Sequence, residues 1–225
     1  MEPEIAKKIL EKNKEDYEEL AKEFSRTRAY PWPEIKPLIK YVKENNRILD
    51  LGCGNGRLFS LFKDKKVEYI GLDSCQELIE IARKKLQVKF IVGDALNLPF
   101  QNNEFDVVFG VALLHHIPSE QFRQKVLKEC RRVLKPGGFL IVTCWNLWQP
   151  RLMLKYRIWP MIFGWRSRNL DWKDIFIPWK LPNRSLLRYY HAFTLRELKR
   201  LVWRAGFEIN SWQKGHNLAI IAKKR

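Results

Sequence analysis

The sequence predicts a doubly wound α/β domain with a seven-stranded, mostly parallel sheet that includes one antiparallel strand. Short apolar runs alternate with helical patterns from residue 47 onward, which is typical of βαβ units and a parallel sheet. The length of 225 residues suits one domain with an elaborated insert. Two final apolar runs are separated by a turn that is short enough for a hairpin, and this predicts the antiparallel strand.

The elements follow in order from local patterns. A charged amphipathic stretch predicts a helix over 3–24, and prolines on both sides of Trp32 end it before a shorter helix over 36–43. The expected strands are Arg47–Leu51, Val67–Leu72, Val88–Val92, Phe105–Val111 and Phe139–Thr143, and the expected helices are Gly56–Phe62, Gln76–Leu86 and Ser119–Leu134. The breakers Lys-Pro-Gly-Gly at 135–138 are expected to form a turn between the last helix and the next strand.

The regular alternation lapses after Thr143 and returns near Thr194. Residues 145–190 hold six of the nine tryptophans and nine Lys or Arg against two Asp. A helix over 194–205 is predicted because Thr194 and Glu197 have the spacing of a capping box. Two strands over 207–213 and 218–223 are expected to end the sheet. We therefore expect a single domain, 1–225, with a helical cap (1–45), a cofactor-binding core (46–144), a substrate-binding insert (145–190) and a C-terminal helix with strands (191–225).

The charge is strongly basic and unevenly distributed. Lys and Arg number 42 against 25 Asp and Glu, a formal net charge of +17. Residues 145–225 carry 17 of the basic and four of the acidic side chains, a net charge of +13. A field concentrated at one end of the chain indicates a polyanionic partner such as nucleic acid or an anionic membrane surface. A merely solubilising surface is the alternative.

The cysteines and the N-terminus argue against several classes of protein. The four cysteines form no C-x-x-C pair and have no matching histidine spacing, so we expect no metal site and no disulfide. The N-terminal stretch is charged and helical, unlike a signal peptide. The most apolar window, 153–165, is short and interrupted by Lys155, Arg157 and Pro160, so it cannot span a bilayer. A cytoplasmic protein is expected, with no stable membrane association.

The most specific local motif is Ile-Leu-Asp-Leu-Gly-Cys-Gly-Asn-Gly at 48–56, a strand that ends in a glycine-rich turn. Glycines there allow backbone N–H groups to approach a ligand closely. A nicotinamide or flavin site is the rival interpretation. The spacing G-x-G-x-G argues against it, because Arg57 occupies the third dinucleotide glycine position, where a side chain would disturb helix–strand packing.

Acidic residues follow the first three strands. Asp50 precedes the glycine turn, Asp73 ends the second strand and Asp94 follows the third. A carboxylate at the position of Asp73 can accept hydrogen bonds from both ribose hydroxyls, and Asp94 is placed to accept from an adenine amino group. Three acids at the carboxyl edge of successive strands predict an adenosyl pocket, against the alternative of three unrelated turn acids.

The motifs DLGCGNGR, GLD, GDALNLPF, FDVVFGVALLHH and RRVLKPGG resemble those of class I S-adenosylmethionine-dependent methyltransferases over residues 45–145. The resemblance implies that the glycine turn holds the methionine portion, Asp50 orients its amino group, Asp73 binds the ribose, and Asp94 with Ala95 binds the adenine. The full set of cofactor-binding residues expected is Arg28, Asp50, Gly52, Gly54, Asp73, Ser74, Asp94, Ala95 and Val111.

Four further stretches are similar to the tRNA methyltransferases that esterify a carboxymethyl group on the wobble uridine, including the methyltransferase domain of the AlkB-like tRNA enzymes. They are 24–28 with 31–33, 114–117, 174–179 (Asp-Ile-Phe-Ile-Pro-Trp) and 188–191 (Arg-Tyr-Tyr-His). Residues 192–194 and the last strand, which lacks a tryptophan pair, depart from the family pattern. The resemblance implies tRNA as substrate and, in relatives, a small zinc-containing activator subunit.

The chemistry of that reaction needs a cation more than a base. A carboxymethyl group has a pKa of about 4, so its carboxylate is ionised at neutral pH and needs no general base. An arginine suits a carboxylate because its planar fork donates to both oxygens. We expect Arg188 to anchor the substrate carboxylate, and Arg28 to hold either the cofactor carboxylate or an RNA phosphate. Tyr189, Tyr190 and Trp179 are candidates to stack on or hydrogen-bond the extruded base.

The histidines offer further candidates. His116 is expected to contact substrate while His115 packs inward, His191 either orients Arg188 or caps the next helix, and His216 has no specific role. The predicted catalytic residues are Arg188, His116, Tyr190 and His191. The predicted substrate-binding and RNA-binding residues are Arg151, Lys155, Arg166, Arg168, Trp179 and Tyr189. Most tryptophans of the insert are expected to be core residues, with one or two stacking on nucleotides.

Two other functions are compatible with parts of the sequence. Residues 148–165 mix cations with large apolar side chains, so a small-molecule, quinone or lipid methyltransferase acting at a membrane surface is the main alternative. Such an enzyme does not require the concentrated positive charge or the stretches at 174–179 and 188–191. A catalytically inactive binding module is disfavoured because the cofactor motifs are intact.

Overall fold

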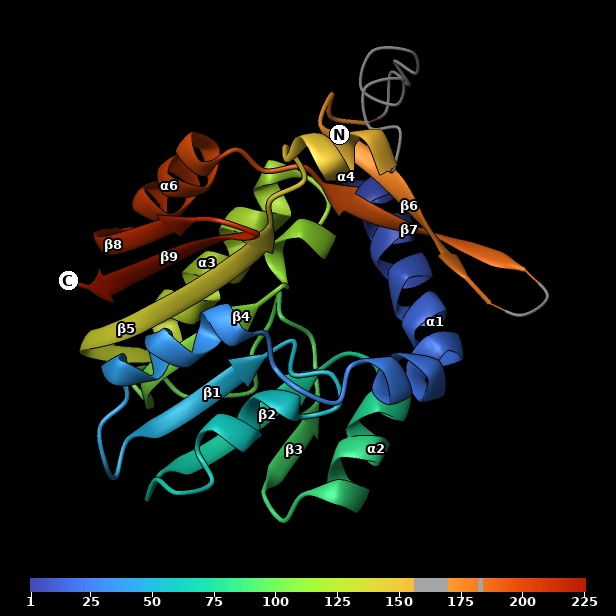
Figure 1. Cartoon of the computed structure of the whole chain (residues 1–225). Helices are drawn as coiled ribbons and strands as arrows, with labels where there is room; N and C mark the ends of the chain where they lie inside the picture. The colour runs from blue at the N-terminus through green and yellow to red at the C-terminus, as the bar shows by residue number, and fades with distance from the viewer. Residues whose placement is uncertain (156–169, 182–183) are drawn as a thin grey trace.

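The computed structural model describes residues 1–155, 170–181 and 184–225 (Figure 1). Its main element is a seven-stranded sheet with the order β3-β2-β1-β4-β5-β9-β8. The strands are β1 Arg47–Leu51, β2 Glu68–Asp73, β3 Lys89–Val92, β4 Phe105–Val111, β5 Leu134–Trp145, β8 Phe207–Lys214 and β9 Asn217–Lys224. Strands β1 to β5 pair in parallel, and β9 is antiparallel to both of its neighbours, β5 and β8. The prediction of a mostly parallel sheet with one antiparallel strand is confirmed.

Helices cover both faces of this sheet. They are α1 Pro3–Thr27, α2 Gln76–Lys85, α3 Glu120–Val133, α4 Pro150–Lys155 and α6 Leu195–Arg204, with 3-10 turns η1 Pro33–Tyr41, η2 Arg57–Leu61 and η3 Leu114–His116. The side chains of β4 show the two layers, because neighbours in a strand point to opposite faces. Val108 belongs to the apolar cluster under α3 and α6, whereas Val107 and Phe109 belong to the cluster under η1 and η2. The capping box at Thr194 and Glu197 is present.

Two details of the sheet differ from the expectation. The breakers at 135–138 lie within β5 as a bulge rather than before it, because Leu134 pairs with Phe105 and the ladder resumes where Phe139 pairs with Val107. The sheet ends on β8, and the antiparallel β9 is inserted between β8 and β5. The hairpin connection itself is as expected, but its antiparallel strand lies inside the sheet rather than at the end of it.

The stretch after Thr143 contains more regular structure than its sequence pattern indicated. Strands β6 Asp174–Lys180 and β7 Ser185–His191 form a separate antiparallel hairpin, in which Ile177 pairs with Arg188. The two stretches 174–179 and 188–191 are therefore partners in one small sheet. Helix α1 runs alongside this hairpin, beyond the carboxyl ends of the central strands (Figure 1). Within the residues described, no helix is both long enough and apolar enough to cross a membrane.

Candidate active site

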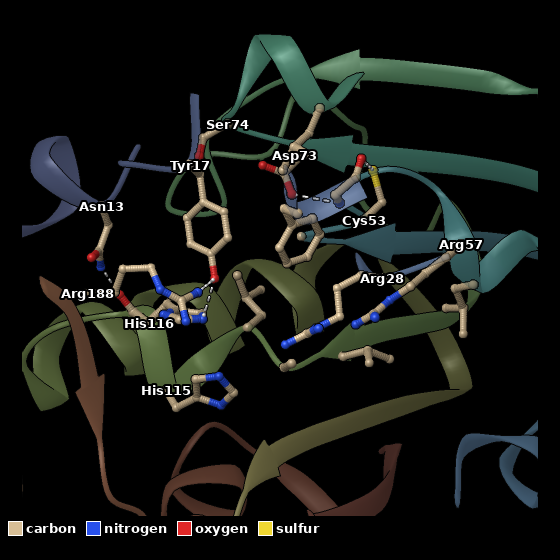
Figure 2. A pocket seen from close by; sticks show the side chains of 18 of the residues that line it. Asn13, Tyr17, Arg28, Cys53, Arg57, Asp73, Ser74, His115, His116 and Arg188 are labelled. Atoms are coloured by element: carbon tan, nitrogen blue, oxygen red, sulfur yellow. Dashed lines mark hydrogen bonds between the residues drawn. The ribbon is translucent and has the colours of Figure 1, made fainter. Parts of the chain in front are cut away.

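A cavity lies at the carboxyl ends of β1, β2 and β4, where α1, η1, η3 and β7 close over it (Figure 2). It contains about 1130 Å³ of space not filled by atoms, a figure that includes open solvent at its mouth. Many of the residues singled out from the sequence line it: Arg28, Asp50, Gly52, Gly54, Asp73, Ser74, Val111, His116, Trp179, Arg188 and Tyr190. The topology therefore brings the expected cofactor and substrate groups into one space.

The glycine turn forms the floor of the cavity. Gly52, Gly54 and Gly56 have φ values of 72°, 54° and 74°, in the left-handed region that favours glycine. A Cβ atom at Gly52 would lie 2.9 Å from the Leu113 side chain. The Gly54 N–H donates to Oδ2 of Asp73 over 2.8 Å, which ties the turn to the end of β2. The turn is thus held in a shape that leaves its backbone open to a ligand.

Asp73 lies at the end of β2 with both carboxylate oxygens oriented by backbone donors. Oδ2 accepts from Gly54, and Oδ1 accepts from the Cys75 N–H over 2.9 Å. Burial raises the pKa of Asp73, and these backbone donors oppose that rise. Each oxygen keeps a further lone pair. The carboxylate can therefore accept two hydroxyl groups, such as those of a ribose.

Asp50 lies near the end of β1 and is 2% exposed. The Tyr69 hydroxyl donates to its Oδ2 over 2.5 Å. Burial raises its pKa to about 7, an effect to which the negative charge of Asp73 adds and which the Tyr69 hydrogen bond opposes. A bound ammonium group would favour the ionised carboxylate. The site therefore fits the amino group of an amino-acid cofactor portion.

Three arginines point into the cavity, and aromatic rings flank them (Figure 2). The Cζ atoms of Arg28 and Arg188 lie 5.2 and 4.5 Å from the Trp179 ring centroid, and that of Arg57 lies 4.9 Å from the Trp32 centroid. Burial lowers the pKa of Arg57, and the positive charge of Arg28 adds to this effect. Among the described residues no carboxylate lies within 4.0 Å of these guanidinium groups. The cavity thus combines a buried acid, Asp50, and a half-buried acid, Asp73, with cations that have no acidic partner among the described residues.

His116 occupies the cavity wall in a fixed orientation. Its Nδ1 lies 3.1 Å from the backbone carbonyl oxygen of Tyr189, and its Nε2 lies 3.0 Å from the Tyr17 hydroxyl. Burial lowers its pKa to about 3, and the charge of Arg188 adds to this effect, so the ring is neutral at physiological pH. His115 is buried and stacks against Tyr190 at 5.3 Å. Both histidines line the cavity, including His115, which was expected to pack inward.

The alternation of β7 separates the residues of the Arg-Tyr-Tyr-His stretch. Arg188 and Tyr190 line the cavity, whereas Tyr189 and His191 point to the opposite face of the hairpin. Tyr189 was predicted to bind substrate and His191 to be catalytic, and the location of these side chains outside the cavity disagrees with both predictions. The Tyr189 hydroxyl donates to Asp174 over 2.6 Å instead.

His191 belongs to a buried ionic network between β6, β7 and α6. Its Nδ1 lies 2.7 Å from Asp174 and its Nε2 lies 2.8 Å from Glu197, the acid of the capping box. His191 does not cap the helix itself, because Thr194 is the N-cap; His191 instead contacts the side chain of the capping-box acid Glu197. Asp171, Asp174 and His191 offer atoms within 4.8 Å of one another, a spacing that a metal could use. Arg123 lies 3.8 and 3.6 Å from the two aspartates, so the cluster is neutralised by a side chain.

The remaining predicted residues lie elsewhere or outside the described residues. Asp94 is exposed, accepts the Leu96 N–H over 2.8 Å, and with Ala95 does not line the cavity. The contact of these two residues with adenine stays a prediction. Arg151 and Lys155 lie on α4, away from the cavity lining. Arg166 and Arg168 lie outside the described residues.

Sequence reasoning missed Tyr17 and Asn13, which α1 places against the cavity. The Asn13 side-chain amide donates to the backbone oxygen of His116 over 3.0 Å. Tyr17 lies between His116 and Arg188 (Figure 2). The available signal was their i,i+4 spacing on a helix, which puts both on one face. In a charged helix such a pair is hard to recognise from the sequence, because polar residues on such a helix are normally exposed.

Comparison with known proteins identifies the class. Residues 49–142 match the family model described as a methyltransferase domain. A solved S-adenosylmethionine-dependent methyltransferase from Methanosarcina mazei has the same fold, with a TM-score of 0.70 and 24% identity over 87% of this chain and 98% of that one. A protein of Encephalitozoon cuniculi that carries the name of a methyltransferase is 31% identical over 86% of this chain and 85% of its own. The fold is that of a methyltransferase.

The chain belongs to the class I S-adenosylmethionine-dependent methyltransferases, and S-adenosylmethionine is its cofactor. The tRNA (carboxymethyluridine(34)-5-O)-methyltransferase of Arabidopsis thaliana is 38% identical over 143 residues, 64% of this chain and 34% of that protein. The chain spans 20–34% of the length of several curated tRNA methyltransferases that it resembles. The acids, the glycine turn and the cations of the cavity all fit the cofactor's amine, ribose and carboxylate.

Proposed function

We propose that this protein is a tRNA methyltransferase that converts the carboxylate of a carboxymethyl-modified wobble uridine into its methyl ester. The observation that carries the proposal is the environment of the Arg188 side chain. Its side chain is 3% exposed, it faces the cofactor cavity, and no carboxylate of the described residues lies within 4.0 Å of it. A buried cation without an acid is costly unless an anion binds it. The Arabidopsis relative is named for its action on a carboxymethyluridine, and the carboxymethyl group carries such an anion.

The cofactor side of the site would be held by this chain's acids and glycines. Asp73 would accept the ribose hydroxyls, Asp50 would accept the amino group, and the backbone of Gly52 and Gly54 would lie along the methionine portion. Arg28 would bind either the cofactor carboxylate or a phosphate of the RNA. Bound there, the cofactor supplies an electrophilic methyl group on a sulfonium sulfur.

The substrate side would hold a nucleophile that is already ionised. A carboxylate with a pKa of about 4 needs no base at neutral pH. His116 agrees with this chemistry, because its Nδ1 faces a carbonyl oxygen and its Nε2 faces the Tyr17 hydroxyl, so neither nitrogen is free to accept a proton from substrate. A carboxylate held by Arg188 would be methylated as its anion, so the residues of this chain would need to orient and desolvate it but not to accept a proton.

Aromatic side chains would position the base and exclude water. Tyr190 stacks against Trp145 with centroids 5.3 Å apart and an interplanar angle of 23°. Trp179 contributes a further ring beside Arg188. Stacking of an extruded base on such rings is a general mode of RNA recognition. Holding the carboxylate in line with the methyl group in a dry site is then the main contribution to rate.

The division of the chain and its partners form part of the same proposal. Residues 1–45 would cap the site, 46–144 would bind cofactor, and 145–190 would contact RNA through basic and aromatic side chains. A small zinc-containing activator subunit is included as a partner. The membrane-surface alternative, a quinone or lipid methyltransferase, gains no specific support from the described residues.

The test is analysis of the nucleosides of tRNA treated with the protein and labelled S-adenosylmethionine. Mild alkali should release the label as methanol, because it hydrolyses a methyl ester but leaves N-, C- and ribose O-methyl groups intact. Mass spectrometry should locate the new ester on a carboxymethyluridine. Label that resists alkali would exclude the ester, and only the assignment of the protein as a methyltransferase would remain. The protein should be tested alone and co-expressed with an activator subunit.

A further inference from the structure

Tyr17 binds one amino group of the Arg188 guanidinium and thereby determines which of its N–H groups remain for a ligand. Nη1 of Arg188 donates to the Tyr17 hydroxyl over 2.8 Å. Nε of Arg188 is buried and has no hydrogen-bond partner, and Nη2 makes no hydrogen bond to any residue that the structure describes. In a guanidinium, Nε and Nη2 point their N–H bonds along the same edge, and that edge forms a two-pronged donor for a carboxylate. The Tyr17 contact therefore occupies one amino group and leaves this edge free.

The direction of this hydrogen bond is fixed by a chain that ends on the backbone. The Tyr189 carbonyl oxygen can only accept, so Nδ1 of His116 carries the proton. Since His116 is neutral, its Nε2 must accept, and the Tyr17 hydroxyl must donate to it. The Tyr17 oxygen is then free to accept from Arg188. Each member has one permitted orientation, and Figure 2 shows the three side chains meeting at the Tyr17 hydroxyl.

Aromatic rings restrict the other movements of the guanidinium. Its Cζ lies 4.5 Å from the Trp179 centroid, 5.2 Å from Tyr190 and 5.5 Å from Tyr17. With rings beside it and one amino group fastened, the plane of the guanidinium cannot rotate without breaking the Tyr17 hydrogen bond and moving off these rings. The free edge is therefore preorganised before any ligand arrives.

We propose that Tyr17 is a positioning residue that sets Arg188 for two-pronged binding of a carboxylate, and that this geometry selects a carboxymethyl group over a carbamoylmethyl group. The inference rests on the proposed function and adds the reason for its substrate specificity. A carbamoyl group presents one oxygen acceptor and one NH₂ donor, so its NH₂ would face an N–H of Arg188. Donor opposed to donor in a buried site discriminates strongly. The ester product has lost the negative charge, which favours its release.

The experiment compares Tyr17→Phe with Glu15→Ala, a control on the same helix. Glu15 is exposed on α1 and does not line the cavity. Calorimetry with the S-adenosylhomocysteine complex measures binding of carboxymethyluridine and carbamoylmethyluridine nucleosides or short anticodon-loop RNAs. Steady-state kinetics on tRNA then separate kcat from KM, and cofactor affinity is measured as a check on folding.

The wild type should prefer the carboxymethyl ligand by at least about tenfold, as expected for a charge-assisted pair of hydrogen bonds. Tyr17→Phe should lose most of this preference and lower kcat, while its cofactor affinity stays within about twofold of the wild type. Glu15→Ala should keep the preference. A Tyr17→Phe protein that retains the full preference, or a wild type with none, overturns the inference. Failure of the proposed function is a separate result, because it is read from alkali-stable label in the wild-type product.

Discussion

The Tyr69 hydroxyl and the Asp50 carboxylate form a short hydrogen bond of 2.5 Å beneath the cofactor cavity. Both groups are buried, and burial raises the pKa values of both. The hydrogen bond favours the ionised form of Asp50 but does not outweigh burial, so the pKa of Asp50 is about 7. The free protein therefore holds an acid that changes its charge near physiological pH, at the place where we expect the cofactor amino group.

Cofactor affinity should rise as the pH increases from about 6 to about 7, through the Asp50 pKa. An ammonium group binds the ionised Asp50, and below the pKa of about 7 the protein must first release a proton. Calorimetry should show a tightening that approaches about tenfold per pH unit below this pKa and ends above it, where the α-ammonium group of the cofactor itself begins to deprotonate at about 7.7–8. Comparing buffers of different ionisation enthalpy should detect the released proton. Asp50→Asn should bind weakly at every pH, with the dependence gone. Equal affinity of the wild type across this range would remove Asp50 from the amine site.

Asp73→Ala should weaken the binding of S-adenosylmethionine and of S-adenosylhomocysteine by at least about tenfold. The substitution removes two charge-assisted hydrogen bonds to the ribose, each worth about 1.5–3 kcal/mol. It also releases the Gly54 N–H that Asp73 now holds. Asp64→Ala is the matched control, because Asp64 is exposed on the loop before β2. Unchanged affinity of the Asp73 variant would contradict the ribose assignment, and binding of NAD would contradict the cofactor.

His191→Ala should destabilise the fold rather than act on chemistry. The change leaves two carboxylates, those of Asp174 and Glu197, without their shared partner, which costs about 3 kcal/mol or more. Burial alone would raise the pKa of Glu197, but His191 and Lys173 lower it to about 2. That contribution to stability is present above pH 4.5, the usual pKa of a Glu, and is lost as the pH falls through about 2.

Urea unfolding with and without His191 checks this prediction, and His216→Ala in the exposed β8–β9 turn is the control. The free energy of unfolding should fall in the first variant only. Cofactor affinity of the folded fraction should remain within about twofold in both. A His191 variant of full stability and lost turnover would restore the catalytic interpretation of this histidine.

The sequence was informative wherever position follows from a local pattern. The strands before Asp50 and Asp73 are continuous apolar runs, so their carboxyl ends and the acids on them were placed correctly at one edge of the sheet. The bulge at 135–138 shows the limit of local patterns, since prolines and glycines indicate a break. Only the pairing of Leu134 with Phe105, on another strand, shows that the ladder has already begun.

The substrate side depended on contacts that no local pattern contains. Arg188 and Tyr17 are 171 positions apart, and only the docking of α1 against β7 brings them together. Interpreting residues 188–191 as one motif assigned all four to catalysis or substrate binding. Interpreted as a strand, the alternation alone would have separated Arg188 and Tyr190 from Tyr189 and His191. The sequence pattern did not indicate that strand, because aromatic and charged residues interrupt the apolar runs in this part of the chain.

RNA binding should be electrostatic and should depend on the basic C-terminal part. Affinity for tRNA should fall steeply with salt, because each neutralised phosphate releases counterions. Reversing the charges at Arg151, Lys155, Arg166 and Arg168 should flatten the logarithmic salt slope by about 0.7–0.9 for each phosphate that is no longer neutralised. Reversal of four exposed lysines outside this part of the chain, Lys43, Lys63, Lys66 and Lys84, controls for net charge. Equal slopes in all proteins would make the basic insert a solvated surface.

Arg188→Ala should lower kcat/KM for ester formation by roughly 10²-fold or more, equivalent to about 3 kcal/mol of lost transition-state stabilisation. The reason is the loss of the charged anchor for the reacting carboxylate. Arg188→Lys should recover only part of the activity, because a point charge cannot donate to both oxygens in one plane. Cofactor affinity should stay within about twofold in both variants, since the cofactor's amine and ribose are expected to contact other residues.

Arg184→Ala is the control for the arginine substitutions, because Arg184 directly precedes β7 and pairs with Glu19 on α1. Its side chain is 61% exposed, and exposed pairs contribute little to stability, so activity should be nearly unchanged. The assay follows alkali-labile methyl transfer to tRNA alongside cofactor calorimetry. If Arg188→Ala retained full activity while still forming an alkali-labile product, the ester would stand and the anchor would be a different cation. Arg28 and Arg57 are then the candidates, because both point into the same cavity without a carboxylate within 4.0 Å among the described residues.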